Sequence, residues 1–424
     1  MVIPLEDRQR WLFPGVLALF VFGYLVLAGK EFAASRFAAR PDLTDLERAV
    51  RLSSGNAEYR YRLGRYFAFV ASNPQAAAEN FRVATALNPH QARYWFDLAS
   101  AYQVAGNPAG QREALERALQ AEPTAPEVAW EAANFFLVAG DMDRAFHEFR
   151  VVIENEPTLA GLAFQSCWRA SPDTDVMLRD AVPASADSLI SFLSFLMYKH
   201  ETDGAIKVWD RLMQLHQKFQ PRYLFEFVNF LVLAHRPDAA SAAWEQTASL
   251  LDLSSYLPTA DNLIVNGDFS QDILNGGFDW TYVNRTGVRL LLDSSDFRQG
   301  NRSLSITFEG PGISDAGVRQ LIAVHGQTDY DFTAYYKSAE FQGAGGPQIV
   351  LRDAYTGAAL FTSEPLNDAD FWKPVHAKLS TPPTTNLLAL TIERFPAGHP
   401  IRGKLWLDNF ELSPATAAES KDHL

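Results

Sequence analysis

Two pairs of aspartates are spaced closely enough to place two carboxylates in one site: Asp268 with Asp272, and Asp368 with Asp370. Paired carboxylates could act as the acid and the base of a glycoside hydrolase. Both pairs fall in predicted surface turns, where aspartate is common because its side chain bonds the nearby backbone. The chain also lacks the sequence patterns of zinc metalloproteases, serine hydrolases, P-loop enzymes and dinucleotide-binding enzymes. We therefore expect no catalytic residues, and a glycan-processing enzyme is the least favoured alternative.

The cysteine, histidine and charge content narrows the classes of protein that remain possible. The single cysteine, Cys167, excludes an intrachain disulfide and a site built from several thiolates, and the nine histidines are scattered. Asp and Glu outnumber Lys and Arg by 50 to 37, and neither half of the chain is basic, which disfavours nucleic acid as a partner. The 424 residues are 47% hydrophobic and 21% charged, which is typical of folded domains, and the length predicts about two or three of them.

An uncharged stretch near the N-terminus is long enough to cross a membrane. Residues 11–29 form a 19-residue apolar run, which as a helix would span roughly 28 Å. We interpret residues 1–40 as an uncleaved signal anchor with a transmembrane helix at about 11–29, and a cleaved signal peptide is the alternative. Basic residues flank both ends of the run, so charge does not fix its orientation.

A 34-residue period runs through the alanine-rich segment that follows. Prolines mark the ends of the units, where they stop a helix, and glycines mark predicted turns within them. Similar residues recur 34 positions apart: Pro89, Pro123 and Pro157; Phe81, Leu115 and Phe149; Ala84, Ala118 and Val152; and Gly106 and Gly140. This pattern resembles the tetratricopeptide repeat (TPR), a 34-residue pair of helices. The resemblance covers about residues 42–255, so we assign 41–257 to an all-α, TPR-like solenoid that begins with a lone second helix at 42–54.

The resemblance implies that a protein or peptide binds along the concave surface formed by the first helices of the repeats. The side chains expected to line this groove are mostly aromatic: Tyr59, Tyr66, Phe69, Phe96, Trp130 and Asn134. Phe96 stands where some members of the family carry a lysine that holds a C-terminal carboxylate, so an extended apolar segment is the expected ligand. The alternative is that several of these side chains pack between repeats.

Near residue 258 the helical pattern gives way to short alternating runs separated by Gly, Asn, Asp and Pro, which is typical of antiparallel strands and turns. Residues 262–269 (NLIVNGDF) are followed by 278–280 (FDW), 330–337 (YDFTAYYK) and 405–410 (LWLDNF). This ordered set resembles the carbohydrate-binding modules of families four and nine, which are jelly rolls of the galactose-binding kind. The resemblance covers residues 262–413, so we predict an all-β sandwich at 258–416 and a short tail at 417–424.

The resemblance implies sugar binding, and the period of a strand selects the candidate residues. In 330–337, Tyr330, Phe332, Ala334 and Tyr336 share one face and are predicted to be core, whereas Tyr335 lies on the polar face. We expect Tyr335 to stack on a sugar ring, with Tyr282, Arg352 and Tyr355 as lesser candidates. Packing roles are predicted for Trp280, Trp372 and Trp406. The alternative is a degenerate, structural sandwich that binds no sugar.

The same resemblance implies a structural calcium ion where the first and last strands meet. Its expected ligands are carboxylate and carbonyl oxygens, with Asp408 in the acidic position of the family. Ser270 stands where an acid commonly follows the Asn-Gly-x-Phe motif, so Asp268 would have to supply the second carboxylate. No cofactor is required, and the calcium ion is a possible structural addition.

These features together predict a multidomain protein with a transmembrane helix, a TPR-like solenoid and a jelly-roll sandwich. We predict a single-pass, non-enzymatic scaffold or adaptor of the bacterial cell envelope, with both domains on the periplasmic or extracytoplasmic side. Its partners would be a protein or peptide in the repeat groove, a polysaccharide on the sandwich, and the membrane. Such a protein would suit the assembly of exopolysaccharide or another surface glycan. The alternative is a scaffold for proteins alone.

Overall fold

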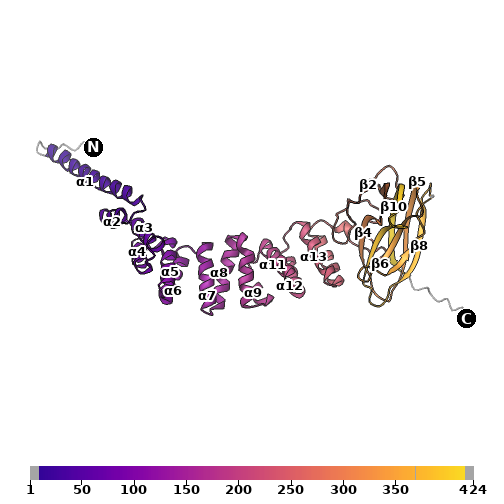
Figure 1. The fold of residues 1–424 in the computed structure, drawn as a ribbon, viewed down its shortest axis with the longest axis horizontal. Coiled ribbons are helices and arrows are strands. Elements are labelled where there is room, and N and C mark those ends of the chain that lie inside the picture. Colours follow the sequence, from indigo (N-terminus) through magenta and orange to yellow (C-terminus); the bar gives the residue numbers. More distant parts are fainter. Residues whose placement is uncertain (1–8, 368, 416–424) are drawn as a thin grey trace. The chain divides into compact units, whose positions relative to one another are not determined.

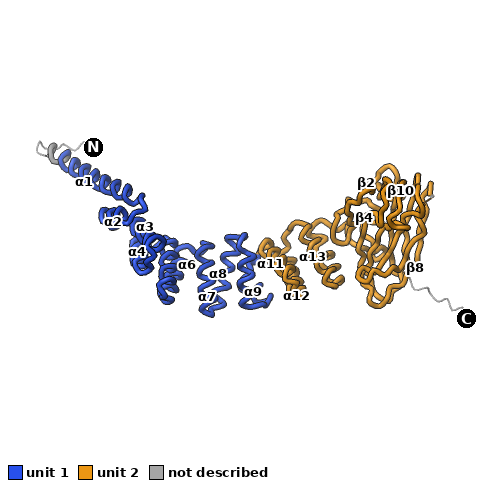
Figure 2. The backbone as a smooth tube through the Cα atoms, in the orientation of Figure 1, with its two compact units in different colours: residues 1–184 blue, residues 185–424 orange. Residues whose placement is uncertain are grey.

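The structure, a computed structural model, describes residues 9–367 and 369–415. The chain divides into two compact units, residues 1–184 and 185–424 (Figure 2). The described part of the first unit is helical, and the second unit joins further helices to a β-sandwich (Figure 1). The predicted helical array and jelly-roll sandwich are both present, so the fold class is confirmed. The predicted start of the sandwich domain, residue 258, lies inside the second unit.

Helix α1 (Gln9–Ala38) contains the apolar N-terminal segment. Its part Pro14–Ala38 is long and apolar enough to cross a membrane, and none of its most apolar window is buried in the protein. The end of the helix differs, because Ala34 and Ala38 are buried against α2 (Leu43–Leu52) and α3 (Ala57–Phe69). The helix at 42–54 is therefore not alone. It pairs with the end of α1, which takes the place of the missing first helix.

Three helical hairpins follow, as the 34-residue period predicts. They are α3 with α4 (Pro74–Leu87), α5 (Ala92–Val104) with α6 (Pro108–Ala121), and α7 (Pro126–Val138) with α8 (Met142–Asn155). The period then breaks, and the first unit continues with η1 (Pro157–Leu159), α9 (Ala160–Ala170) and α10 (Thr174–Asp180). Cys167 in α9 is fully buried, and burial raises the pKa of its thiol to about 12, so this cysteine is part of the core.

The repeated residues act at the turns and at the contacts between helices. Gly106 and Gly140 have φ angles of +71° and +77°, a left-handed conformation that glycine adopts with little strain. Asn73 and Asn107 cap α4 and α6, because each side chain accepts a hydrogen bond of 3.0 Å from a backbone N–H of the first turn. Small alanines and large apolar residues make the buried contacts between helices: Ala77, Phe81, Ala84, Leu115, Ala118 and Phe149.

The second unit opens with two more hairpins, α11 (Ala186–Tyr198) with α12 (Thr202–Gln214) and α13 (Pro221–Leu233) with α14 (Pro237–Ala248). A short helix, η2 (Ser254–Tyr256), leads into the sandwich. Among the described residues, the strands form two antiparallel five-stranded sheets.

We call the two sheets A and B. Sheet A has the order β1-β4-β9-β6-β7, with β1 (Thr281–Tyr282), β4 (Asp315–Ala323), β9 (Leu387–Phe395), β6 (Gly346–Asp353) and β7 (Ala359–Thr362). Sheet B has the order β2-β3-β10-β5-β8, with β2 (Val288–Asp293), β3 (Ser303–Gly312), β10 (Pro400–Pro414), β5 (Asp329–Gln342) and β8 (Lys373–Ser380).

An apolar core fills the space between the sheets. The Trp280 ring packs against the rings of Phe269 and Phe410, each with its centroid 5.1 Å away. Along β5, Tyr330 and Phe332 are buried in this core, which follows the alternation predicted from the sequence. Ala334 and Tyr336 continue this inner face, so the alternate residues Asp331, Thr333, Tyr335 and Lys337 belong to the outer face of sheet B.

Helices α13 and α14 pack against the sandwich through Trp244, which is 2% exposed. Its indole Nε1 donates a hydrogen bond of 2.8 Å to the carbonyl oxygen of Tyr256, and its ring meets Phe278 edge-on at 6.1 Å between centroids. Gly277 comes so close that a Cβ atom there would lie 1.9 Å from the Trp244 ring. The last hairpin and the sandwich therefore share a core, in agreement with their place in one compact unit.

Asp279 is completely buried beside this contact. Burial raises the pKa of its carboxyl to about 6, although its Oδ2 accepts a hydrogen bond of 2.7 Å from Leu274 N. The folded state therefore holds this proton more tightly than the unfolded chain, in which an aspartate titrates near ~3.9. The resulting stabilisation is complete below the unfolded pKa and is lost as the pH rises through about 6.

We expect Asp279→Asn, which does not titrate, to gain stability relative to the native chain as the pH rises. The difference in unfolding free energy between variant and native chain should shift in favour of the variant by about 2 kcal/mol between pH 4 and pH 7.5. Urea titrations of both proteins at several pH values measure this. A difference that does not change with pH would show that Asp279 is ionised in the folded protein.

Candidate binding sites

Two cavities of the first unit share Phe69, which is 69% exposed at the end of α3. The first, of about 360 Å³, lies between α3, α4 and α5 and is lined by Phe96 and by Val104, which is 74% exposed. The second, of about 320 Å³, lies between the end of α1, α2 and α3 and is lined by Tyr66 and Val70. We call this surface the α3–α5 groove, defined by Tyr66, Phe69, Val70, Phe96 and Val104. It offers open apolar side chains to a ligand.

Three of the six predicted groove residues line these cavities: Tyr66, Phe69 and Phe96. Tyr59 does not, because it is 7% exposed and its hydroxyl donates a hydrogen bond of 2.8 Å to Glu31 Oε1. Burial, reinforced by this bond, raises the pKa of Tyr59 to about 12. Its assignment to the groove is therefore corrected, because Tyr59 links α3 to α1 through this hydrogen bond.

Trp130 and Asn134 lie in α7 and line neither cavity. The Trp130 ring meets Phe149 edge-on at 5.5 Å between centroids, and Asn134 Nδ2 donates a hydrogen bond of 2.8 Å to the carbonyl oxygen of Trp130. The first contact lies within the α7–α8 hairpin and the second within α7, so neither is a contact between repeats, and the assignment of these two residues to the groove stays a prediction.

Charged groups border the α3–α5 groove. The guanidinium of Arg65 lies 5.3 Å from the centre of the Phe69 ring and 5.8 Å from that of Tyr61. Asp97 lines the larger cavity and accepts a hydrogen bond of 2.7 Å from the Tyr61 hydroxyl. Burial, with this carboxylate beside it, raises the pKa of Tyr61, so the phenol keeps its proton and its bond to Asp97. Arg40 and Arg62 also line the smaller cavity, so charges of both signs flank an apolar surface.

On the sandwich, Tyr335 lies on the outer face of sheet B, half-buried on β5. The guanidinium of Arg298 is 3.4 Å from the centre of its ring. On the neighbouring strand β10, Trp406 is 9% exposed, with Lys404 Nζ 4.2 Å from its ring centre and its Nε1 donating to Asp293 Oδ2 at 2.9 Å. Trp406 packs, as predicted, but on the outer face of the sheet. Both rings are thus stacked with cations, which the sequence did not indicate.

Two of the lesser candidates for sugar binding have side chains that contact other residues of the protein. Tyr355 stacks on His235, at the turn between α13 and α14, with 4.2 Å between ring centroids, and its hydroxyl is buried. Arg352 on β6 donates hydrogen bonds of 2.8 and 2.7 Å to the two carboxylate oxygens of Glu393. Neither residue joins Tyr335, because they belong to sheet A and the loop after it. Their assignment to a sugar site is corrected to structural roles.

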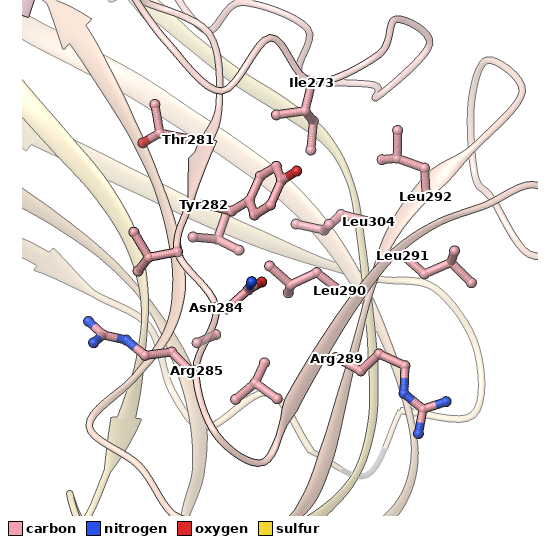
Figure 3. A pocket seen from close by; sticks show the side chains of 14 residues that line it. Ile273, Thr281, Tyr282, Asn284, Arg285, Arg289, Leu290, Leu291, Leu292 and Leu304 are labelled. Carbon is pink, nitrogen blue, oxygen red and sulfur yellow. The ribbon is translucent and has the colours of Figure 1, made fainter.

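Tyr282 lines a cavity of about 410 Å³ at the edge of the sandwich, between β1 and β2 (Figure 3). Apolar side chains form most of its wall, among them Ile273, Leu290, Leu292 and Leu304. In Figure 3, Leu291 and Arg289 point away from the Tyr282 side of the cavity. The sequence did not reveal this cavity, because it forms where the edges of two different sheets meet. Trp280, also assigned to packing, is fully buried in the core.

The two predicted calcium ligands approach the same loop. Asp408 is buried, and its Oδ2 accepts hydrogen bonds of 2.7 and 3.1 Å from two backbone N–H groups at 298–299. Burial raises the pKa of Asp408, and the charge of Asp268 adds to this rise. Asp268 itself accepts a hydrogen bond of 2.6 Å from the Ser270 hydroxyl. The described residues contain no cluster of three or more His, Cys, Asp or Glu side chains, so backbone oxygens would have to complete a calcium shell. Calcium binding stays a prediction.

Both parts of the fold have counterparts among solved structures. The protein MamA is one: it is 14% identical, and the alignment covers 46% of this chain and 98% of MamA with a TM-score of 0.32. A family 4 carbohydrate-binding module is 17% identical over 36% of this chain and 99% of the module, with a TM-score of 0.29. The CBM22-1 xylan-binding domain of Paenibacillus barcinonensis Xyn10C is 20% identical over 38% and 99%, with a TM-score of 0.25.

These likenesses concern the fold alone. No protein-family model matches the chain. No curated protein matches it either.

Proposed function

We propose that this protein is a membrane-anchored, non-enzymatic scaffold that holds an extended apolar segment of a partner protein in the α3–α5 groove. The observation that carries this proposal is the pair of cavities that share Phe69. Exposed aromatic side chains of this kind are anchors in protein interfaces, because they bury a large area on binding. Arg65 and Asp97 at the border would orient the segment, and the replacement of Phe69 described in the Discussion tests the proposal.

We further propose that the outer face of sheet B binds a polysaccharide around Tyr335. Aromatic rings stack on the apolar faces of pyranose rings, and Tyr335 is the half-exposed ring of that face. The guanidinium of Arg298 covers this ring and would have to move aside. The same contact favours the second candidate function, a sandwich that serves as a structural or protein-binding module without sugar.

The Tyr335 proposal predicts a specific order of affinities. In affinity electrophoresis of the full chain against the polysaccharide of its own organism, Tyr335→Ala should weaken binding by about tenfold or more, equivalent to ~1.4 kcal/mol. Arg298→Ala should bind at least as well as the native chain, because it uncovers the ring. Phe395→Ala is the control, because it removes a 65% exposed ring on β9 of sheet A, away from the outer face of sheet B, and it should bind normally. Equal retardation of the native chain and Tyr335→Ala would favour the structural sandwich.

The anchor and the location complete the proposal. Helix α1 would hold the protein in the membrane, with the array and the sandwich on the extracytoplasmic side, where polymeric surface glycans occur. In this position the scaffold would join a protein of exopolysaccharide or surface-glycan assembly to the glycan. Alkaline phosphatase fused after Leu424 should be active in cells, and a fluorescent cytoplasmic reporter at that position should not.

A further inference from the structure

The strand β2 has an unprotected edge that differs from the other sheet edges of the sandwich. Among the described strands, β2 pairs with β3 alone and ends sheet B. Edge strands of soluble proteins are usually short or carry proline and lysine, because an exposed row of N–H and C=O groups recruits other strands. The opposite end of sheet B follows this rule, since β8 contains Pro374 and Lys378. The edges of sheet A follow it too, since β1 and β7 have two and four residues.

β2 has neither proline nor lysine and is six residues long, VRLLLD. Its exposed charge is Arg289, which pairs with Glu309 of β3, and Leu291 at its centre is 59% exposed. Leu290 and Leu292 face the core and line the cavity of about 410 Å³ at the sandwich edge. Because the apolar interior is open beside this edge, an added strand would bury apolar side chains as well as pair its backbone.

The hydrogen bonds of β2 show which groups are free. Glu309 N donates a hydrogen bond of 2.9 Å to Gly287 O, and the register places Val288 opposite Phe308. Hydrogen-bonded and non-bonded pairs alternate along an antiparallel ladder, so Arg289 and Leu291 bond β3. The N–H and C=O groups of Leu290 and Leu292 therefore point to the open edge.

The sequence of β2 is complementary to itself in the antiparallel direction. A second copy of the strand related by a twofold axis through Leu291 would place Leu291 opposite Leu291 and Arg289 opposite Asp293. In this register Leu290 lies opposite Leu292, so the free backbone groups of one copy meet those of the other. Opposite charges at facing positions stabilise a strand pair, and like charges destabilise it. Within one chain Arg289 pairs with Glu309, whereas Asp293 is 8% exposed and bonds Lys404, Trp406 and Ser295. The facing charges therefore attract each other across the two strands without a direct ion pair.

We propose that two copies of this protein associate through their β2 edges, in this register, to join two sheets B into one continuous sheet. Such an isologous contact is the usual form of a homodimer interface. The core-facing leucines of each copy extend the apolar layer over the edge cavity of the other. This pairing is independent of the ligands proposed for the groove and for the face of sheet B.

Disulfide trapping of the full chain in its membrane tests the proposal. The register places the two Leu291 residues in a non-hydrogen-bonded pair, with Cα atoms about 4.5 Å apart. A disulfide spans Cα separations up to about 6.8 Å, so Leu291→Cys should form a covalent dimer on mild oxidation. In Arg289→Cys the equivalent residues lie about 13 Å apart along the strands and should give at least about fivefold less dimer. The native Cys167 is buried, so the unaltered chain should form no disulfide-linked dimer and is the negative control.

A second variant measures association without oxidation. Leu291→Lys replaces an exposed side chain, so it should fold normally, but it sets two cations against each other at the twofold axis. The native chain in detergent should sediment as a dimer and Leu291→Lys as a monomer. The absence of a Leu291→Cys dimer, an equal yield from Arg289→Cys, a cross-link to a different protein, or a dimeric Leu291→Lys would each overturn the proposal.

Discussion

Replacing Trp244 by alanine should release the last helical hairpin from the sandwich. Trp244 is 2% exposed and lies between Phe225 of α13 and Phe278 of the sandwich, with ring centroids 6.0 and 6.1 Å away. Removal of a buried tryptophan costs about 3–5 kcal/mol. We expect backbone amides of α13 and α14 to exchange hydrogen about 100-fold faster in Trp244→Ala, while the central strand β9 keeps its protection. Hydrogen exchange read by mass spectrometry measures both segments in one experiment.

Trp209→Ala is the matched control for this change. Trp209 is 1% exposed, but it packs within the helices, where its ring stacks on Phe227 at 4.5 Å between centroids. Its loss should be as destabilising for the helices, yet it should leave the loop at 272–280 protected, because that loop contacts Trp244. If the two variants expose this loop equally, or if neither does, Trp244 does not join the two parts.

Replacing Phe69 by aspartate should abolish binding of the partner protein while leaving the fold intact. Phe69 is 69% exposed and lines both cavities of the α3–α5 groove, so its removal creates no internal void. A charge introduced on an apolar binding surface must lose its hydration when the partner binds. We expect at least about a tenfold loss of affinity, and a change in folding free energy within about 0.5 kcal/mol. The amount of partner that co-purifies with the tagged full chain, and the melting temperature, are the two measurements.

Val138→Asp is the control for Phe69→Asp. Val138 also ends the first helix of a repeat and is 92% exposed, but it lines neither cavity. This variant should bind the partner normally. Equal recovery of the partner by both variants would place the binding surface elsewhere on the array, and a large fall in the melting temperature of Phe69→Asp would make its binding result a consequence of unfolding.

Features that depend on local periodicity were predictable from the sequence. Residues that recur every 34 positions identify the helices, because the same contacts recur in each hairpin. Phe81 and Phe149, for example, are both buried in contacts between helices. The alternation in β5 correctly separates the buried Phe332 from the half-exposed Tyr335. In both cases the periodic pattern of apolar residues within the element itself determines which of its sides is buried.

Features that depend on contacts between distant segments were not predictable. Some turns also lack a sequence signal: Ser72, His200 and His235 adopt φ angles of +51°, +59° and +57° at hairpin-turn positions equivalent to those of Gly106 and Gly140. Tyr59 appears groove-facing from its place in a repeat, but Glu31, 28 residues away, binds its hydroxyl. Tyr355 likewise has a partner, His235, that only the packing of the last hairpin on the sandwich reveals.

The most direct test of the scaffold proposal is photo-cross-linking in living cells from the edge of the α3–α5 groove. A photoreactive amino acid would replace Val104, which lines the larger cavity, and in a second strain Val138, which does not. The account predicts that light produces a covalent adduct between the Val104-substituted chain and another protein, and that this adduct is absent from the Val138 strain and from cells that also carry Phe69→Asp. An adduct of equal yield from both positions, or one that persists with Phe69→Asp, would contradict it.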